Sequence, residues 1–221
     1  MTCRIIPGRF DFSVPEAQWL SDLNGIATDL DVAIALCKRY RRESLHLSKI
    51  PEVDQASWIE DFLTVGDIFF AAIIRYGRTF ASGVRSGIPS DWIDALPKEL
   101  QDAHQYFKTI RDKFVAHSVN RLEDNQVFVI LSTGHDGTER PSHITVDRGR
   151  VVSMGLKDVD LLSVLASDLK ARVEHEIKLE TDRLLEFART IPLGELKARG
   201  VDSVPIPRKA DTYRVRGGFK S

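Results

Sequence analysis

The dominant feature of the chain is a set of four long segments in which apolar residues recur every three or four positions. This spacing lines up one apolar face along an α-helix. The segments run from near Pro15 to the break at Ile50–Pro51, and over about residues 54–82, 97–117 and 157–190. Proline stands at the start of the first and third segments, where it is favoured, and Pro192 ends the last. The sequence therefore predicts a mainly α protein built as an antiparallel helical bundle.

The apolar period shortens before the last long helix. Short runs rich in β-branched residues lie between about residues 124 and 155, at 126–132, 143–147 and 150–154. Gly134 and Gly137 mark one turn between them and Arg148-Gly149 marks the next. We expect a small β-meander inserted into a single helical domain that spans residues 1–190.

The last thirty-one residues differ in character from the domain. Residues 191–221 hold seven basic and three acidic side chains, together with Pro205, Pro207, Gly217 and Gly218. A terminal segment of this composition is typical of chain that does not pack into a core. We expect an extended basic C-terminal tail.

Composition excludes several classes of protein. The formal charge of −1, from 31 Lys+Arg against 32 Asp+Glu, does not fit a broadly cationic protein that coats nucleic acid. The two cysteines, Cys3 and Cys37, form neither a disulfide framework nor a metal-binding pair. The N-terminus lacks the apolar core of a secretory signal, and no apolar run approaches a membrane span. We expect a cytoplasmic protein that does not enter the membrane.

The third helical segment ends in a motif that carries ionisable side chains. Residues 110–118 read IRDKFVAHS, with Arg111, the polar Asp112 and, five residues after that, His117. This arrangement resembles the signature of the HEPN superfamily, whose small helical domains occur in many prokaryotic RNA-cleaving toxins and abortive-infection proteins. The resemblance covers about residues 15–118 and the last long helix, and it implies an HEPN-like bundle.

The resemblance implies a chemistry and a set of partners. It implies a protein that cleaves RNA or a component that binds RNA. Cleavage would need no metal or cofactor, and in it the ribose 2′-OH attacks the adjacent phosphorus and leaves a cyclic phosphate. His117 would be the general base or acid, Arg111 would stabilise the phosphate charge, and Asp112 would orient one of these side chains or the nucleotide. A homodimer, an RNA substrate, and an antitoxin or other protein partner follow from the same resemblance.

Spacing alone does not select this motif. Two further pairs, Arg39–His46 and Arg41–His46, fit the same pattern. Only Arg111 lies in the last turns of a strongly periodic helix. Six positions at about 100° leave Arg111 and His117 roughly 120° apart, so their convergence needs unwinding at residues 116–118 or a second protomer.

A structural role is the main alternative for the motif. A histidine near a helix C-terminus is favoured by the helix dipole and can bond the last carbonyls. The chain would then be a non-catalytic helical dimerisation or protein-interaction module.

Other side chains are candidates for contacts with RNA or phosphate. Arg75, Tyr76 and Arg78 lie on a stretch of the second helix without acidic residues, while His104 and Lys108 lie on the same face of the third helix as Arg111. Tyr76 also continues the apolar stripe, so a core role competes for it. His135, Asp136 and His143 lack the spacing of a metal site, and we expect none.

Overall fold

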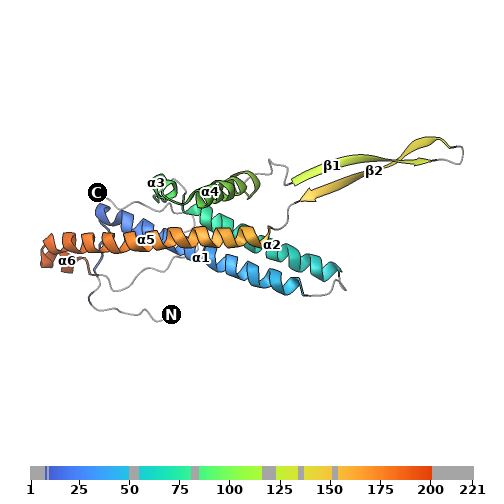
Figure 1. Ribbon diagram of the computed structural model, residues 1–221. Coiled ribbons are helices and arrows are strands. Elements are labelled where there is room, and N and C mark those ends of the chain that lie inside the picture. Colours follow the sequence, from blue (N-terminus) through green and yellow to red (C-terminus); the bar gives the residue numbers. More distant parts are fainter. Residues whose placement is uncertain are drawn as a thin grey trace.

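The computed structural model describes residues 8, 10–49, 55–80, 85–115, 123–133, 137–150 and 154–200. The described part is mainly helical, with a two-stranded antiparallel sheet that extends away from the helices (Figure 1). Its elements are α1 (Gln18–Leu47), α2 (Gln55–Arg78), α3 (Ser90–Asp94), α4 (Lys98–Ile110), β1 (Glu123–Thr133), β2 (Glu139–Arg150), α5 (Leu156–Thr190) and α6 (Leu193–Ala198).

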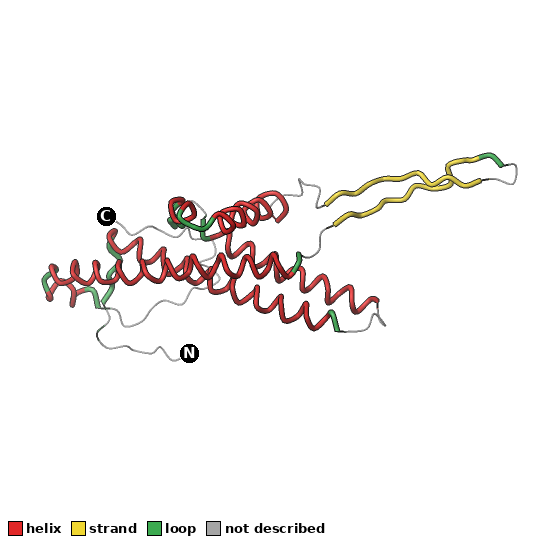
Figure 2. The backbone as a smooth tube through the Cα atoms, in the orientation of Figure 1, coloured by secondary structure: helices red, strands yellow, loops and turns green. Residues whose placement is uncertain are grey.

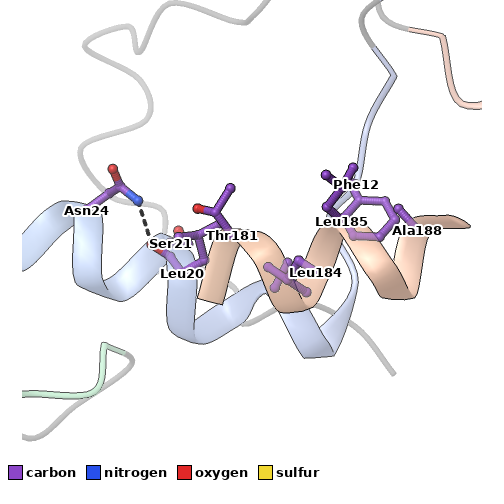
Figure 3. A pocket seen from close by; sticks show the side chains of 9 residues that line it. Phe12, Leu20, Ser21, Asn24, Thr181, Leu184, Leu185 and Ala188 are labelled. Atoms are coloured by element: carbon purple, nitrogen blue, oxygen red, sulfur yellow. Dashed lines mark hydrogen bonds between the residues drawn. The ribbon is translucent and has the colours of Figure 1, made fainter. Parts of the chain in front are cut away.

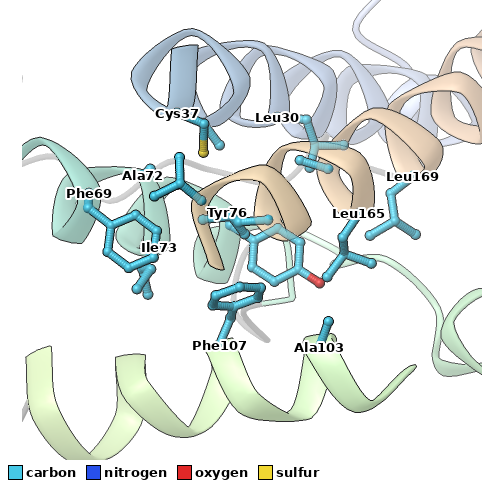
Figure 4. Packing of buried hydrophobic residues seen from close by; sticks show 14 of the residues in the cluster. Leu30, Cys37, Phe69, Ala72, Ile73, Tyr76, Ala103, Phe107, Leu165 and Leu169 are labelled. Atoms are coloured by element: carbon cyan, nitrogen blue, oxygen red, sulfur yellow. The ribbon is translucent and has the colours of Figure 1, made fainter. Parts of the chain in front are cut away.

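Three long helices form the body of the molecule. α1 packs against both α2 and α5, so segments from the start and the end of the chain share one core (Figure 1). α4 lies across this layer and contributes Ala103 and Phe107 (Figure 4). The apolar stripes of the sequence supply the packed side chains, among them Leu30, Cys37, Phe69, Ala72, Ile73, Leu165 and Leu169. Burial of a full stripe from each helix supplies the main stabilisation of such a bundle.

The helix boundaries follow local signals in the sequence. Pro15 opens a short 3₁₀ turn (Pro15–Ala17) that leads into α1. At the start of α5, the carboxylate of Asp158 accepts a hydrogen bond from the backbone N–H of Gly155 at 3.2 Å. The predicted segment at 157–190 thus corresponds closely to α5, and that at 54–82 to the shorter α2.

The predicted β-meander is wrong in the described residues, which form a hairpin of β1 and β2 (Figure 2). The register pairs Gly149 with Asp124 and Arg148 with Asn125, so the expected turn at Arg148-Gly149 lies inside β2. β2 continues through residues 148–150 because their backbone groups pair with those of residues 123–125, at the polar start of β1. Met154, the end of the expected third strand, lies outside any strand, and residues 151–153 lie outside the described residues.

The expectation of an extended segment from residue 191 is also wrong over its first part. Pro192 caps α6, with Glu195 in the first turn and Lys197 in the last, an order that suits the helix dipole. Beyond α6, the backbone N–H of Asp11 donates to the carbonyl of Arg199 at 2.8 Å, so the chain returns to the N-terminal region. Residues 201–221 lie outside the described residues.

Among the helices of the described residues, none combines the length and the apolar character needed to cross a bilayer.

Candidate functional site

The motif lies where α4 ends. Regular α-helix stops at Ile110, and a π-helical turn follows over Arg111–Val115. π-turns are rare and are often found at functional sites. Unwinding at residues 116–118 was one of the two routes to convergence expected from the sequence, and those residues lie outside the described residues; the departure from α-helical geometry begins already at Arg111. His117 lies outside the described residues, so its position relative to Arg111 stays a prediction.

Arg111 is held by two partners from different parts of the chain. Its Nη1 donates to the backbone carbonyl of Gly77 at 2.8 Å, and its Nε donates to Oδ1 of Asp112 at 2.7 Å. Nη2 donates to the same carboxylate oxygen. The side chain is 29% exposed, so Arg111 is partly open to solvent. Asp112 was predicted to orient the arginine, the histidine or the nucleotide, and its contact with Arg111 agrees with the first of these roles.

Gly77 is a residue of this site that the sequence interpretation missed. A Cβ atom at position 77 would lie 2.2 Å from Cδ of Arg111 and 3.2 Å from its Nε, so the arginine passes over bare backbone. A glycine inside a strongly periodic helix costs about 1 kcal/mol relative to alanine and suggests a close approach of another group. That signal was present in the apolar stripe of α2.

His104 and Tyr76 form a buried polar pair between α4 and α2. Tyr76 Oη and His104 Nδ1 share a hydrogen bond at 2.7 Å, and the imidazole packs edge-on against Phe80 with ring centroids 4.6 Å apart. Tyr76 is only 1% exposed, which places its ring in the core and not on a surface for base stacking. Burial raises the pKa of Tyr76, and burial followed by the nearby Lys108 lowers the pKa of His104.

The lowered pKa of His104 predicts a pH-dependent stability. As pH falls below the ordinary value of 6.5, the unfolded chain gains a proton at this position before the folded chain does. The free energy of unfolding should therefore fall with pH in this window, and less steeply in His104→Gln. Urea denaturation over a pH series measures both slopes. His175→Gln, at an exposed position of α5, is the control, and an unchanged slope in His104→Gln would contradict the assignment.

Arg75 and Arg78 lie apart from Arg111, on the side of α2 that faces α1. Together with Arg85 they surround Asp29, whose carboxylate is 4% exposed. Arg75 Nη1 and Arg85 Nη2 lie 3.1 and 3.0 Å from Asp29 oxygens, and Arg78 Nε lies at 3.5 Å. Three guanidinium groups around one carboxylate leave a local excess of positive charge. Arg75 and Arg78 are 41% and 55% exposed, so this excess reaches the surface.

Asp29 is a second residue missed from the sequence. It occupies a position on α1 that is buried along with its neighbours Ile26, Leu30 and Ala33. An acidic residue on the apolar face of a helix requires a buried partner, and this signal could have found the cluster.

An apolar groove lies elsewhere and has no ionisable side chain in its lining. It has a volume of about 570 Å³ and lies between the start of α1 and the end of α5 (Figure 3). Its lining is Phe12, Ala17, Leu20, Ser21, Asn24, Thr181, Leu184, Leu185 and Ala188. A groove without an acid, a base or a charged side chain does not suit phosphoryl chemistry.

Over its described residues the chain also holds no group of three or more His, Cys, Asp or Glu side chains that would bind a metal. Comparison with protein-family models, with curated proteins and with solved structures finds no match for this chain.

Proposed function

We propose that the protein is an HEPN-like, metal-independent endoribonuclease that acts in a toxin or abortive-infection system against phage. The observation that carries the proposal is the placement of the motif arginine. Arg111 lies at the first position of a π-helical turn, fixed by the Gly77 carbonyl and by Asp112, with its side chain partly exposed. This arrangement presents a permanently charged, oriented group at the end of α4.

The contacts of Arg111 leave it able to bind a phosphate. A guanidinium has five N–H donors, and the hydrogen bonds to described residues use three of them. The remaining donors can contact a phosphate oxygen. Because the two partners hold the side chain in place, little reorganisation is needed when charge develops on that oxygen.

The proposed reaction needs proton transfer at two oxygens. The ribose 2′-oxygen loses its proton and bonds to phosphorus, the bond from phosphorus to the 5′-oxygen breaks, and the leaving 5′-oxygen gains a proton. His117 is proposed to serve as the base or the acid, since imidazole exchanges protons near neutral pH. A homodimer that brings two motifs together would supply a histidine for each role.

The arginine cluster on α2 supports binding of an RNA backbone. Arg75 and Arg78 contribute to an excess of positive charge around Asp29 that reaches the surface. Phosphate contacts by such side chains position a nucleic acid without reading its sequence. Lys108, exposed on α4 near His104, adds a further positive charge.

The test is cleavage of total RNA by the purified protein in excess EDTA. We expect cleavage by the wild type and a loss of at least about 100-fold in Arg111→Ala and in His117→Ala, because each removes a group that stabilises or reaches the transition state. Arg189→Ala and His175→Ala replace the same residue types at exposed positions of α5 and should cleave normally. Intact RNA at high protein concentration, or equal cleavage by all variants, would refute the proposal.

One observation favours the alternative of a non-catalytic helical module. Arg111 links the π-helical turn to α2, so it has a structural role whether or not RNA binds. In that case Arg111→Ala would lower the free energy of unfolding, and RNA would remain intact in the presence of the wild type. An antitoxin or other protein would then be the partner.

A further inference from the structure

The β1–β2 hairpin exposes apolar side chains on both of its faces. Val127 and its cross-strand partner Val146, and Val129 with its partner Ile144, lie on one face, with Val127 and Ile144 65% and 68% exposed. Phe128 and Ile130 alternate with them on the other face and are also exposed. The hairpin extends away from the helices (Figure 1). An isolated two-stranded ribbon is marginally stable in water, so we expect a further strand or surface to stabilise this hairpin.

The two edges of the hairpin differ in how they are protected. β2 carries Pro141, a residue that cannot donate to a further ladder, and the charged Asp147 and Arg148. Between Val127 and Thr133, β1 has neither a charged residue nor proline or glycine. Every second residue of a two-stranded ribbon turns its N–H and C=O away from its partner strand. Among the described residues only β2 pairs with β1, so the opposite edge of β1 is a template for another strand.

We propose that β1 pairs antiparallel with β1 of a second copy of this chain, so that two hairpins form one four-stranded sheet. A two-fold axis through Phe128 would place Glu123 and Asp124 opposite Thr133 and Ser132 of the other copy. Acidic groups then face hydroxyl groups. A parallel pairing in register would instead align the acidic residues of the two copies, which is unfavourable. The sequence of β1 thus suits an isologous contact with itself.

This contact is distinct from the motif-to-motif pairing that the resemblance implies. With the axis through Phe128, the two hairpin bases lie about 34 Å apart, given ten residues at about 3.4 Å each. The sheet contact alone therefore keeps the Arg111 side chains of the two copies apart. The inference does not depend on RNA cleavage, because a non-catalytic module would associate by the same edge.

The test compares self-association of the full-length wild type with that of Phe128→Lys by sedimentation velocity over a concentration series. We expect the wild type to associate through β1 and the Kd of that step to rise at least about 100-fold in Phe128→Lys, because the two lysines would face each other across the axis. Where the motif-to-motif contact also forms, the wild type should assemble beyond a dimer and Phe128→Lys should stop at the dimer. An equimolar mixture of Phe128→Lys and Phe128→Glu should restore the β1 contact between unlike copies. Circular dichroism checks that the helices remain folded.

Ile144→Lys is the matched control. It also replaces an exposed apolar residue of the hairpin by lysine, but on the outer strand, and it should leave the dimer Kd within about threefold of the wild type, which is under 1 kcal/mol. A monomeric wild type, a Phe128→Lys protein whose assemblies are as large as those of the wild type, a mixture that shows no gain in assembly size over either variant alone, or an equal effect of Ile144→Lys would each overturn the proposal. RNA cleavage is measured separately: RNA cleavage with no effect of Phe128→Lys on assembly refutes the β1 contact alone, and intact RNA with a β1-dependent assembly refutes the enzymatic proposal alone.

Discussion

Replacing Gly77 by alanine is expected to remove RNA cleavage while the protein remains about as stable as the wild type. The added Cβ would lie 2.2 Å from Cδ of Arg111, so the arginine must leave its position over α2. The higher helix propensity of alanine raises the free energy of unfolding by about 1 kcal/mol. This offsets the loss of the Arg111–Gly77 hydrogen bond, which also contributes about 1 kcal/mol. Displacement of a catalytic group lowers the reaction rate on the order of 100-fold. The rate of RNA cleavage in EDTA measures this loss.

Gly25→Ala provides the control for this variant. Gly25 is also a helical glycine that faces an arginine, but a Cβ there would approach Arg85 most closely at Nη1, at 3.0 Å, and would lie at an ordinary contact distance of 3.4 Å from its Cδ. That end of the side chain can move, and Arg85 is outside the motif, so cleavage should be retained. Wild-type cleavage by Gly77→Ala would show that the observed position of Arg111 is not the one used in the reaction.

Asp29→Asn is expected to cause the largest loss of stability, about 3 kcal/mol. The substitution keeps the shape of the side chain but removes the charge that balances Arg75, Arg78 and Arg85. Breaking a buried ion pair costs about 3–5 kcal/mol, and the lower end applies because two of the arginines reach solvent. For a chain of this size the melting temperature should fall by about 6–12 °C.

Asp31→Asn on the same helix is the matched control. Asp31 pairs with Lys170 at 2.7 Å but is 59% exposed, so its loss should cost less than about 1 kcal/mol. Urea denaturation of both variants gives the comparison. Equal effects would mean that the Asp29 cluster contributes no more than a surface ion pair.

The helices could be predicted from the sequence because each carries a continuous apolar stripe. The stripe of the last segment, which includes Leu162, Leu165 and Leu169, predicted a helix over 157–190, and the structure has α5 over Leu156–Thr190. Packing of the apolar stripes against one another stabilises the same helices that the local sequence favours. The spacing of the apolar residues therefore agrees with the tertiary structure. The mainly helical architecture with a small antiparallel sheet is confirmed.

The β region and the tail were predicted less well because their signals are local. Arg148-Gly149 predicts a turn from the sequence. In the structure both residues pair with β1, and this pairing decides where β2 ends. Pro192 was interpreted only as the end of a helix, although proline also favours the first turn of the next one, here α6.

The candidate site was predicted in part. Arg111 and Asp112 were identified from the motif, and their contact is present in the structure. Gly77 and Asp29 each interrupt the apolar stripe of a helix, which is a signal in the sequence. They were missed because the residues that explain them, Arg111 for Gly77 and the three arginines for Asp29, lie far away in the chain. The HEPN resemblance and the role of His117 stay predictions.

The proposed reaction requires Arg111 and His117 to promote attack of a ribose 2′-OH on the adjacent phosphorus. This requirement is tested by comparing an RNA substrate with the same sequence carrying 2′-O-methyl riboses, both in EDTA. We expect the wild type to cut the RNA to cyclic-phosphate ends and to leave the methylated strand intact, and Arg111→Ala to cut neither. Equal cleavage of both strands, or no cleavage of either by the wild type, would contradict it.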